Sequence, residues 1–435
     1  NFYNREKEIT LLNRIRERAK RSAQMTFVVG RRRIGKTALL KKAYSDKLTL
    51  YFFVAKKNEA LLCEEFLGEI KSKLDVQIFG SMKSFRDIFG YLMELSQKRH
   101  FTLIIDEFQE FYNVNPSVYS DMQNIWDAQK GNSKINLVLC GSVYSLMSRI
   151  FEQSEEPLFG RATQRIHLKE FDVNTLKSIL SEYRPKYTPD DLLAFYTITG
   201  GVAKYVELLV EARAFTLRSM LNEIFSQNSL FLDEGKNVLI DEFGKDYGNY
   251  FSILSLIASS KTSRVEIESI LEMQTGGFLE RLESDFGIIR KVKPFMAKPL
   301  SRSIKYQIND NFLNFWFRFI YKYRSTIEIG NLDYLKTLVL QNYSTYSGKI
   351  LEKYFLQKIS IEGDFSEIGT YWEKGNKNEI DIVAINNRQK RVKFYEVKRN
   401  ASNGSVEQLK NKAKNILPSL KGYKDQYEIL SLDDM

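Results

Sequence analysis

Five short apolar runs recur through the first 170 residues, and amphipathic segments separate them. The runs cover residues 26–29, 48–55, 101–105, 136–141 and 163–168. Apolar runs of this length that alternate with helical patterns are typical of a parallel sheet, because each crossover between parallel strands needs a helix. We therefore expect an α/β core over residues 1–170.

Beyond Lys169 the period of the apolar residues becomes helical. Apolar residues three and four positions apart predict helices over residues 172–181 and 190–195, and a further helix begins at Gly200 and Gly201. We assign these helices to a small helical lid over residues 171–240.

Residues 245–310 predict a winged helix. Its three helices are expected over residues 250–258, 265–271 and 277–286, and its hairpin strands over 288–293 and 303–308. A densely aromatic helix over residues 309–323 follows, and its rings predict core or interdomain packing rather than a platform for stacked bases. These elements form a third predicted domain, residues 241–325.

The last block, residues 326–435, combines a helix with a predicted hairpin. The helix covers residues 349–355, and alternation of apolar and polar residues predicts strands over 379–385 and 392–398. Asn386 and Asn387 supply the turn between the strands. The expected architecture is therefore α/β: a parallel-sheet core, a helical lid, a winged helix and a C-terminal α/β domain.

Composition changes this picture little. Hydrophobic residues make up 43% of the 435, and no apolar run approaches the ~18 residues of a membrane span. The first residues form a charged helix with no apolar signal region, so we expect a cytoplasmic protein without membrane contact. Cys63 and Cys140 lie in apolar surroundings and should be reduced, buried thiols. Two cysteines and two histidines argue against a structural zinc site.

The formal net charge of +11 favours nucleic acid as a partner without establishing it. The third helix of the predicted winged helix carries Glu280, Glu283 and Asp285, so it is a poor reader of a groove lined by phosphates. The predicted wing carries the basic residues Arg290, Lys291, Lys293, Lys298, Arg302 and Lys305. These side chains could contact phosphates without sequence preference. A winged helix used for packing and protein contacts is the alternative, and the sequence leaves both open.

The first apolar run leads into a phosphate-binding pattern. Gly30, four further residues, and then Gly35, Lys36 and Thr37 fit G-x-x-x-x-G-K-[ST]. The glycines allow successive backbone N–H groups to point at one anion, and the helix that follows adds the positive end of its dipole. We expect the phosphates of ATP to be bound by Gly30, Arg31, Arg32, Arg33, Ile34, Gly35, Lys36, Thr37 and Ala38.

Acidic and hydroxyl side chains follow two later apolar runs. Asp106 ends the run over residues 101–105 and would hold Mg²⁺ together with Thr37. Glu107 comes next and would orient and deprotonate the attacking water, which indicates hydrolysis rather than binding alone. Ser142 follows the run over residues 136–141 and could sense the γ-phosphate or the water.

The C-terminal hairpin carries a second set of charged residues. Asp381 lies on its first strand, while Glu396 and Lys398 share one face of the second. Glu352 lies upstream on the predicted helix. Two carboxylates about 4 Å apart repel by about 4 kcal/mol at an effective dielectric of about 20, and a divalent cation removes that cost. We therefore interpret Asp381 and Glu396 as candidate Mg²⁺ ligands, with Lys398 placed to hold a water or a phosphate.

At this point the chain resembles the archaeal-type ATPase group of the AAA+/STAND-like P-loop ATPases, which is also found in bacteria. The segments that carry the resemblance are residues 2–9, 30–37, 104–109, 157–161 and 199–205. The resemblance implies that Asn4 and Arg5 lie near the adenine, and Asn4 could also cap the first helix, since both roles are compatible. It also implies that Arg161 senses the γ-phosphate or reaches into a neighbouring subunit, so a homo-oligomer is left open. Ala203 stands where the family usually has proline, which weakens the case for a sensor at Lys204.

The C-terminal block resembles the PD-(D/E)XK nuclease superfamily, in the version appended to such ATPases. Asp381 matches the motif aspartate, Glu396 and Lys398 match E-x-K, and Glu352 matches the helical acid. Further matches are Gln408, Trp372 and Glu379. The resemblance implies catalytic roles for Glu352, Asp381, Glu396 and Lys398 in metal-dependent cleavage. A domain that keeps these residues and only binds a partner is the alternative.

Three functions follow from this reasoning. The first is an ATP-hydrolysing, Mg²⁺-dependent regulatory ATPase that acts on nucleic acid, with DNA cleavage by the C-terminal domain. The second is a signalling ATPase whose C-terminal domain binds a partner and cleaves nothing. The third is a chaperone-like scaffold that uses the aromatic helix.

Overall fold

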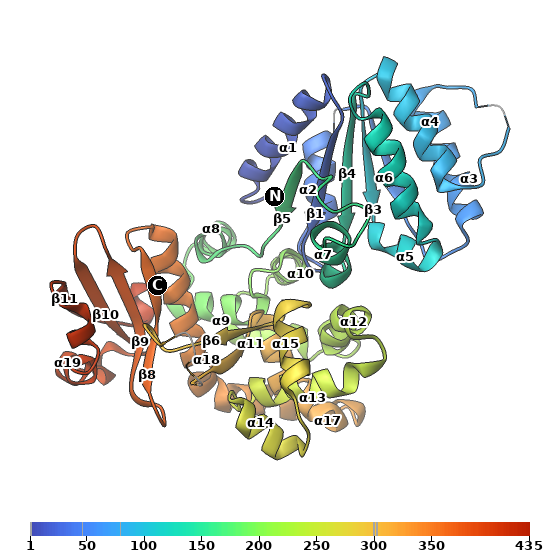
Figure 1. Cartoon of the computed structure of the whole chain (residues 1–435). Coiled ribbons are helices and arrows are strands. Elements are labelled where there is room, and N and C mark those ends of the chain that lie inside the picture. The colour runs from blue at the N-terminus through green and yellow to red at the C-terminus, as the bar shows by residue number, and fades with distance from the viewer. Residues whose placement is uncertain (1, 46, 79, 299–300, 302) are drawn as a thin grey trace. The chain divides into compact units, whose positions relative to one another are not determined.

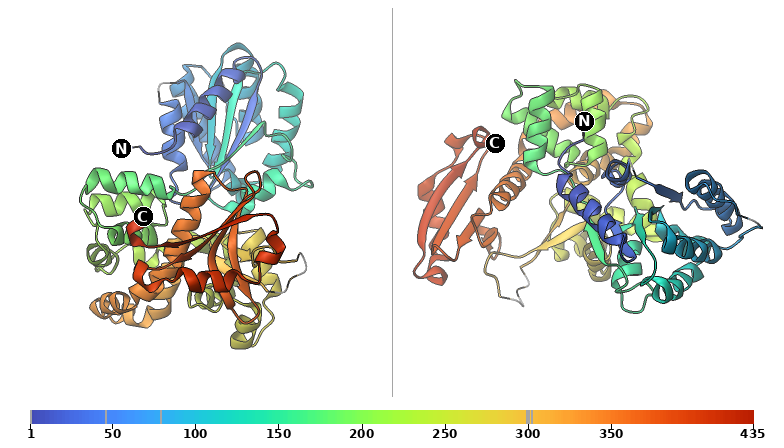
Figure 2. Two further views of the ribbon diagram at one scale, coloured as in Figure 1. Left: turned by 90° about the vertical axis from the view of Figure 1, so that its left-hand side faces the viewer. Right: turned by 90° about the horizontal axis from the view of Figure 1, so that it is seen from above.

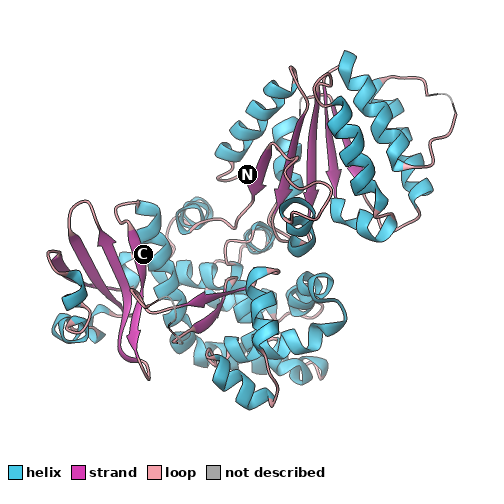
Figure 3. Ribbon diagram, viewed as in Figure 1, coloured by secondary structure: helices cyan, strands magenta, loops and turns pink. Residues whose placement is uncertain are grey.

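The computed structural model describes residues 2–45, 47–78, 80–298, 301 and 303–435. It divides into two compact units, Asn1–Lys169 and Glu170–Met435, and each is described by itself. Figure 3 shows its strands gathered into three separate sheets: one in the first unit and two in the second.

The first unit is built on a five-stranded parallel sheet, which confirms the predicted α/β core. Its strands are β1 (Gln24–Val29), β2 (Thr49–Phe53), β3 (Phe101–Asp106), β4 (Ile135–Gly141) and β5 (Gln164–His167). They are ordered β2-β3-β4-β1-β5 (Figure 1). Every residue of β1, β3 and β4 is buried, as expected of central strands covered on both faces.

Helices cover both faces of this sheet because successive strand residues point to opposite sides. Phe27 and Val29 of β1 belong to one core cluster, and Val28 belongs to the other. One face is covered by α1 (Glu6–Ala19) and α2 (Lys36–Tyr44). The other is covered by α3 (Glu59–Leu74), α4 (Phe85–Lys98), α6 (Ser117–Gln129) and α7 (Tyr144–Glu152). The short helices η1 (Phe108–Glu110) and α5 (Phe111–Val114) follow β3. Cys63 and Cys140 are buried free thiols, as expected.

The second unit begins with helices, and side chains cap the first turn of several of them. They are α8 (Val173–Tyr183), α9 (Pro189–Thr199), α10 (Ala203–Glu211), α11 (Leu217–Ile224) and α12 (Phe231–Phe243). Asp172 caps α8 through the backbone N–H of Thr175, and Thr188 forms a capping box with Asp191 at the start of α9. Each cap satisfies backbone N–H groups that the first turn leaves without a partner.

Three helices and a hairpin follow, in the order that the sequence predicts. They are α13 (Tyr247–Ala258), α14 (Arg264–Leu271) and α15 (Gly276–Ser284), and then the antiparallel strands β6 (Ile289–Val292) and β7 (Lys305–Ile308). The aromatic helix α16 (Asn311–Phe319) is shorter than expected. Trp316 and Phe317 are at most 2% exposed and pack against Phe251 of α13, so this helix belongs to the core.

The remainder is a four-stranded sheet with helices beside it. The short α17 (Arg324–Glu328) precedes α18 (Leu332–Glu362), which is far longer than the single predicted helix over residues 349–355. The strands are β8 (Glu367–Glu373), β9 (Lys377–Asn386), β10 (Arg391–Val397) and β11 (Lys424–Leu430), in the order β11-β10-β9-β8. β10 pairs in parallel with β11, and the other pairs are antiparallel.

Two helices accompany this sheet. Helix α19 (Val406–Ala413) packs Leu409 and Ala413 against Val383 and Phe394 of the sheet. Helix α18 lies alongside the sheet in both views of Figure 2. Among the described residues no helix, α18 included, is long and apolar enough to span a membrane.

Candidate nucleotide site and C-terminal carboxylate site

The predicted phosphate loop connects β1 to α2 at the carboxyl edge of the sheet. Gly35 has a φ of 94°, which glycine tolerates, and Arg33 also has a positive φ of 73°. A Cβ at Gly30 would lie 2.7 Å from the carbonyl oxygen of Leu168, so glycine is needed where the loop leaves β1. The backbone therefore takes the tight course that the motif requires.

Lys36 points back into this loop. Its Nζ donates to the carbonyl oxygens of Gly30 at 2.6 Å and Arg31 at 2.9 Å. The residue is 7% exposed, and burial lowers the pKa of its ammonium group. A phosphate in the loop would give this buried cation an anionic partner in place of two neutral carbonyls.

Asp106, at the end of β3, lies beside the first turn of α2. Its Oδ2 accepts from Thr37 Oγ1 at 3.1 Å and from the hydroxyl of Tyr51, and its Oδ1 accepts from Cys140 Sγ at 3.1 Å. Burial, and then the hydrogen bond to Asp106, raise the pKa of Tyr51. Hydroxyl and carboxylate oxygens are the ligands that Mg²⁺ prefers, so the pair Thr37 and Asp106 fits a magnesium ion.

Glu107 is held by two hydrogen bonds to one oxygen. Its Oε2 accepts from Ser142 Oγ at 2.7 Å and from Gln109 Nε2 at 2.5 Å. Arg32 of the phosphate loop donates to Ser142 Oγ at 3.3 Å. The structure therefore brings together Glu107, Ser142 and the loop, as the sequence indicates, and adds Gln109, which the sequence analysis did not single out.

Gln109 depends on a glycine in the neighbouring strand. Its side chain is fully buried, and a Cβ at Gly141 would lie 2.0 Å from Gln109 Oε1 and 2.6 Å from Met147 Sδ. Any larger residue at position 141 would displace the glutamine that holds Glu107. Gly141 thus leaves the space that Gln109 occupies, and Ser142 supplies a hydroxyl, so both neighbours help to hold Glu107.

The two residues that were expected near the adenine lie at the start of α1. Arg5, and not Asn4, occupies the N-cap position, and its side chain makes no cap hydrogen bond. Arg5 is buried, donates to the carbonyl oxygen of Lys169 at 2.7 Å and pairs with Glu8 at 3.5 Å. The alternative that Asn4 caps the helix stays a prediction. The expectation of adenine contact is untested by this geometry.

Arg161 lies at the wrong edge of the sheet for a γ-phosphate sensor in its own chain. It pairs with Asp127 near the end of α6, at 3.1 Å. Two residues later the Thr163 N–H donates to Met25, at the amino end of β1. The phosphate loop follows the carboxyl end of the same strand. The alternative within one chain is corrected because the chain returns to the amino-terminal edge before β5 begins, and the alternative that Arg161 reaches into a neighbouring subunit stays a prediction.

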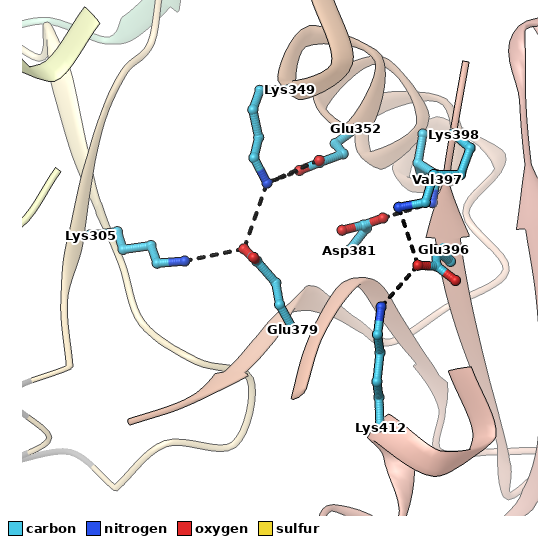
Figure 4. Close-up of polar contacts among 9 residues, drawn as sticks. All are labelled: Lys305, Lys349, Glu352, Glu379, Asp381, Glu396, Val397, Lys398 and Lys412. Carbon is cyan, nitrogen blue, oxygen red and sulfur yellow. Dashed lines mark hydrogen bonds and ion pairs between the residues drawn. The ribbon is translucent and has the colours of Figure 1, made fainter. Parts of the chain in front are cut away.

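The C-terminal carboxylates lie on the adjacent strands β9 and β10. Ile382 and Tyr395 form the last pair of this antiparallel ladder, and Asp381 and Glu396 are the next residues on the two strands. Asp381 Oδ2 accepts from the backbone N–H of Val397 at 2.7 Å (Figure 4). The sheet therefore positions both acids, as the predicted hairpin requires.

Glu396 has one oxygen with partners and one without. Its Oε1 accepts from Lys412 of α19 at 2.9 Å and pairs with Lys398 at 3.2 Å. Burial acts to raise the pKa of Glu396, but these two lysines outweigh it and hold the pKa below its usual value. Oε2 is buried and has no hydrogen-bond partner. Lys412 is a member of this site that the sequence analysis missed.

Glu352 of α18 completes the group. Lys349 pairs with it at 3.0 Å and with Glu379 at 3.6 Å. Burial, and next the charge of Asp381, raise the pKa of Glu352 to about 7, and burial also raises the pKa of Asp381. The carboxylates of Glu352 and Asp381 are drawn in Figure 4 toward the same space.

This raised pKa predicts a pH-dependent stability. Folded Glu352 binds its proton more tightly than the unfolded residue does, so the free energy of unfolding falls as pH rises from about 4.5 to about 7. The loss is at most about 3 kcal/mol. We expect Glu352→Gln to remove this part of the pH dependence, measured by thermal unfolding at pH 5 and pH 8. An equal drop in melting temperature for the variant and the parent would contradict it.

In the described part of the chain, no group of three or more His, Cys, Asp and Glu side chains is arranged to hold a metal ion. Ion pairs with lysines explain part of this absence, because Glu352 and Glu396 each direct an oxygen at an ammonium group instead of at a shared metal position. The unpartnered Glu396 Oε2 still fits a cation, since a buried carboxylate oxygen is costly without a partner.

The predicted wing packs on the C-terminal sheet. Lys305 of β7 pairs with Glu379 at 3.1 Å and lies 4.4 Å from the centre of the Trp372 ring. Trp372 Nε1 donates to Ser303 Oγ at 3.0 Å, and the Phe295 N–H donates to the Thr370 carbonyl at 2.8 Å. These contacts favour the packing role for this hairpin. Arg302 lies outside the described residues.

Comparisons with known proteins agree with the first unit. Residues 2–209 match a family model described as an ATPase domain predominantly from Archaea. Residues 316–414 match a model for archaeal and bacterial proteins of unknown function. An uncharacterised protein of Methanocaldococcus jannaschii, MJECL04, is 28% identical over 408 residues, which cover 91% of this chain and 87% of that protein.

Two solved structures are also similar. The Walker-type ATPase PABY2304 of Pyrococcus abyssi has a TM-score of 0.56 and 18% identity, over 73% of this chain and 96% of that one. The ORC2 protein of Aeropyrum pernix has a TM-score of 0.48 and 14% identity, over 78% and 96%. The first likeness supports the fold of the sheet and its helices, and the family match supplies the activity. Residues 2–209 therefore match an ATPase domain, and the protein is a P-loop ATPase.

Proposed function

We propose that this ATPase regulates action on nucleic acid, and that its C-terminal domain is a PD-(D/E)XK-like module that cleaves DNA with a divalent metal. The observation that carries the proposal is the pair Asp381 and Glu396, held on adjacent strands, with the buried Glu396 Oε2 lacking a partner. Lys398 lies beside this pair.

The order of elements supports a nuclease-like fold. Helix α18 precedes the strands β8, β9 and β10, and α19 separates β10 from the parallel strand β11. This succession matches the order of helical acid, strand aspartate and E-x-K that the sequence analysis noted. The helices α13 to α15 and the β6–β7 hairpin support a winged helix in the same way. We propose that its wing packs against the C-terminal domain.

At the nucleotide site, each residue has a proposed task. Lys36 binds the β- and γ-phosphates, Thr37 and Asp106 hold Mg²⁺, and Glu107 takes a proton from the attacking water. Bound Mg²⁺ would neutralise negative charge on the phosphates. Ser142 and Gln109 hold the Glu107 carboxylate, and we infer that ATP changes this contact through Arg32, which bonds Ser142.

At the C-terminal site, Asp381 and Glu396 would hold Mg²⁺, which would supply an activated water and neutralise a phosphodiester charge. Lys398 would hold the water or the phosphate. Glu352, with a pKa near 7, would accept a proton at neutral pH. Metal binding would require Lys412 or Lys398 to loosen its contact with Glu396.

The second candidate is a STAND-like signalling ATPase with a C-terminal domain that binds a partner and does not cleave. One observation favours it: lysines already neutralise Glu352 and Glu396. In that case ATP would change the size or assembly state of the protein, and Arg161 would act in a neighbouring subunit. A cytoplasmic location suits both candidates and stays a prediction.

A nicking assay separates the two candidates. We expect the parent to nick supercoiled plasmid with Mg²⁺ or Mn²⁺, and Lys398→Ala to nick it at least about 100-fold more slowly while its ATPase rate is kept. Lys393→Ala is the matched control, because Lys393 lies on the other face of β10 and pairs with Glu428 at 3.4 Å. A parent that nicks with neither metal, or a Lys398→Ala variant that nicks like the parent, would contradict cleavage.

A further inference from the structure

A cavity of about 400 Å³ lies within the second unit, between the β6–β7 hairpin and helix α18. Its walls come from α13, β6, β7, α16, α18, β8 and β9. Glu352 and Asp381 of the proposed metal site line it, so the cavity reaches the carboxylates. This volume is in the range of pockets that hold one small molecule or one monomer unit of a polymer.

Two arginines in these walls have no carboxylate partner among the described residues. Arg290 of β6 donates to the neutral Gln307 Oε1 at 3.0 and 3.3 Å. Arg318 of α16 contacts the ring of Phe319, with its guanidinium carbon 5.9 Å from the ring centre. Burial lowers the pKa of Arg290, as expected for a desolvated cation without an anion beside it. A guanidinium in this setting gains most from an anionic ligand.

Two lysines of the same walls are matched by two acids. Lys305 of β7 and Lys349 of α18 both pair with Glu379, at 3.1 and 3.6 Å, and Lys349 also pairs with Glu352 at 3.0 Å. The positive charge that these pairs leave for an anion in the cavity therefore comes from Arg290 of the hairpin and Arg318 of α16.

Helix α18 contributes a polar stripe to the cavity. Most of the residues that line it are polar and recur at three- and four-residue steps: Asn342, Thr345, Tyr346, Lys349, Ile350, Glu352, Lys353 and Leu356. The stripe runs from the exposed Asn342 to Glu352. It therefore connects the outside of the unit to the proposed cleavage site.

We propose that this cavity binds one nucleotide unit of a single-stranded nucleic acid, with its phosphate on Arg290 and Arg318 and the next phosphodiester at Glu352 and Asp381. A volume of about 400 Å³ admits one unpaired unit and is too small for a segment of duplex. The two arginines favour a phosphodiester. This inference names the substrate of the proposed nuclease-like site and so rests on the proposed function.

A binding assay under conditions that prevent cleavage tests this proposal. The full chain is titrated with fluorescein-labelled single strands of twelve thymidines or twelve uridines, and with a 12-base-pair duplex, in EDTA. We expect the single strands to bind more tightly than the duplex. The double variant Arg290→Gln/Arg318→Gln should bind them at least about tenfold more weakly, with a smaller salt dependence, since each phosphate contact contributes about 0.7 to that slope.

Two further variants guard against misfolding and general charge effects. Asn342→Trp adds bulk at the cavity wall without removing charge, and its amide bonds only its own helix in the parent, so it should also weaken binding. Arg324→Gln removes an arginine that pairs with Asp233 at 2.7 Å outside the cavity, and it should bind like the parent. Circular dichroism and thermal unfolding of all variants report intact folding.

The outcomes separate this proposal from cleavage itself. Single-strand binding that is lost in the cavity variants supports it, even if no metal restores cleavage. Cleavage that persists unchanged in the double variant and in Asn342→Trp overturns it, while the nuclease proposal stands. Equal binding of strands by the parent and both cavity variants, or no binding of either strand by the parent, also overturns it.

Discussion

Replacing Lys36 with alanine is expected to reduce the rate of ATP hydrolysis by at least about 100-fold. The Lys36 ammonium lies inside the phosphate loop and bonds the carbonyls of Gly30 and Arg31, so it is already placed at an anion site. Removing one charged donor that stabilises the transferred phosphate costs this much in other enzymes. Affinity for ATP should fall by about 10- to 100-fold as well, because charge-assisted hydrogen bonds contribute about 1.5–3 kcal/mol.

The matched control is Lys42→Ala. Lys42 lies on the same helix, α2, but its side chain is exposed and turned away from the loop. Phosphate release at saturating ATP and Mg²⁺ measures the rate, and circular dichroism confirms folding. A Lys36→Ala protein that is folded and hydrolyses ATP within a few-fold of the parent would show that the loop is not the catalytic phosphate site.

The second large effect is expected from Glu107→Gln. Glutamine keeps the shape of the side chain and can still contact Ser142, but it cannot take a proton from water. A positioned general base contributes about 10²- to 10⁴-fold, so hydrolysis should fall by that factor while ATP binding stays close to that of the parent. The Lys36→Ala variant, in contrast, should lose both hydrolysis and ATP binding.

Glu110→Gln serves as the control for this variant. Glu110 follows three residues later, is also a glutamate and accepts from Asn113 at 3.0 Å instead of from Ser142. Steady-state rates and nucleotide titrations measure hydrolysis and binding separately. Loss of binding in Glu107→Gln, with hydrolysis per bound ATP unchanged, would assign Glu107 a structural role.

The nucleotide site could be predicted from sequence because each of its parts is local. Gly30, Lys36 and Thr37 follow one buried strand, and Asp106 ends another. Carboxyl ends of parallel strands share one edge of a sheet, so adjacency in space follows from the topology alone. A γ-phosphate sensor at Arg161 in its own chain is the exception, because its segment leads into β5 from the opposite edge of the sheet, which no local pattern reveals.

The partners of these residues could not be predicted. Tyr51, Gln109 and Lys412 reach Asp106, Glu107 and Glu396 through side-chain orientation and packing between distant elements. The sequence holds one signal for Gln109, which is Gly141, since a glycine at the end of a buried strand often makes room for a neighbour. Lys412 carries no such signal, because lysines on an amphipathic helix are usually solvated.

The C-terminal sheet shows a second limit. The central strands β9 and β10 have alternating or continuous apolar residues and were predicted. The outer strands β8 and β11 were not, because few of their residues are buried and their sequences are largely polar. Edge strands are defined by hydrogen bonding to a neighbour more than by hydrophobic pattern.

A single-turnover experiment tests the central claim most directly. Excess protein is mixed with trace γ-labelled ATP and Mg²⁺, and retained nucleotide and released phosphate are followed in the same sample for the parent and Glu107→Gln. The account predicts that the parent releases its phosphate within one turnover and that Glu107→Gln retains intact ATP. Phosphate release by Glu107→Gln at the rate of the parent would contradict it.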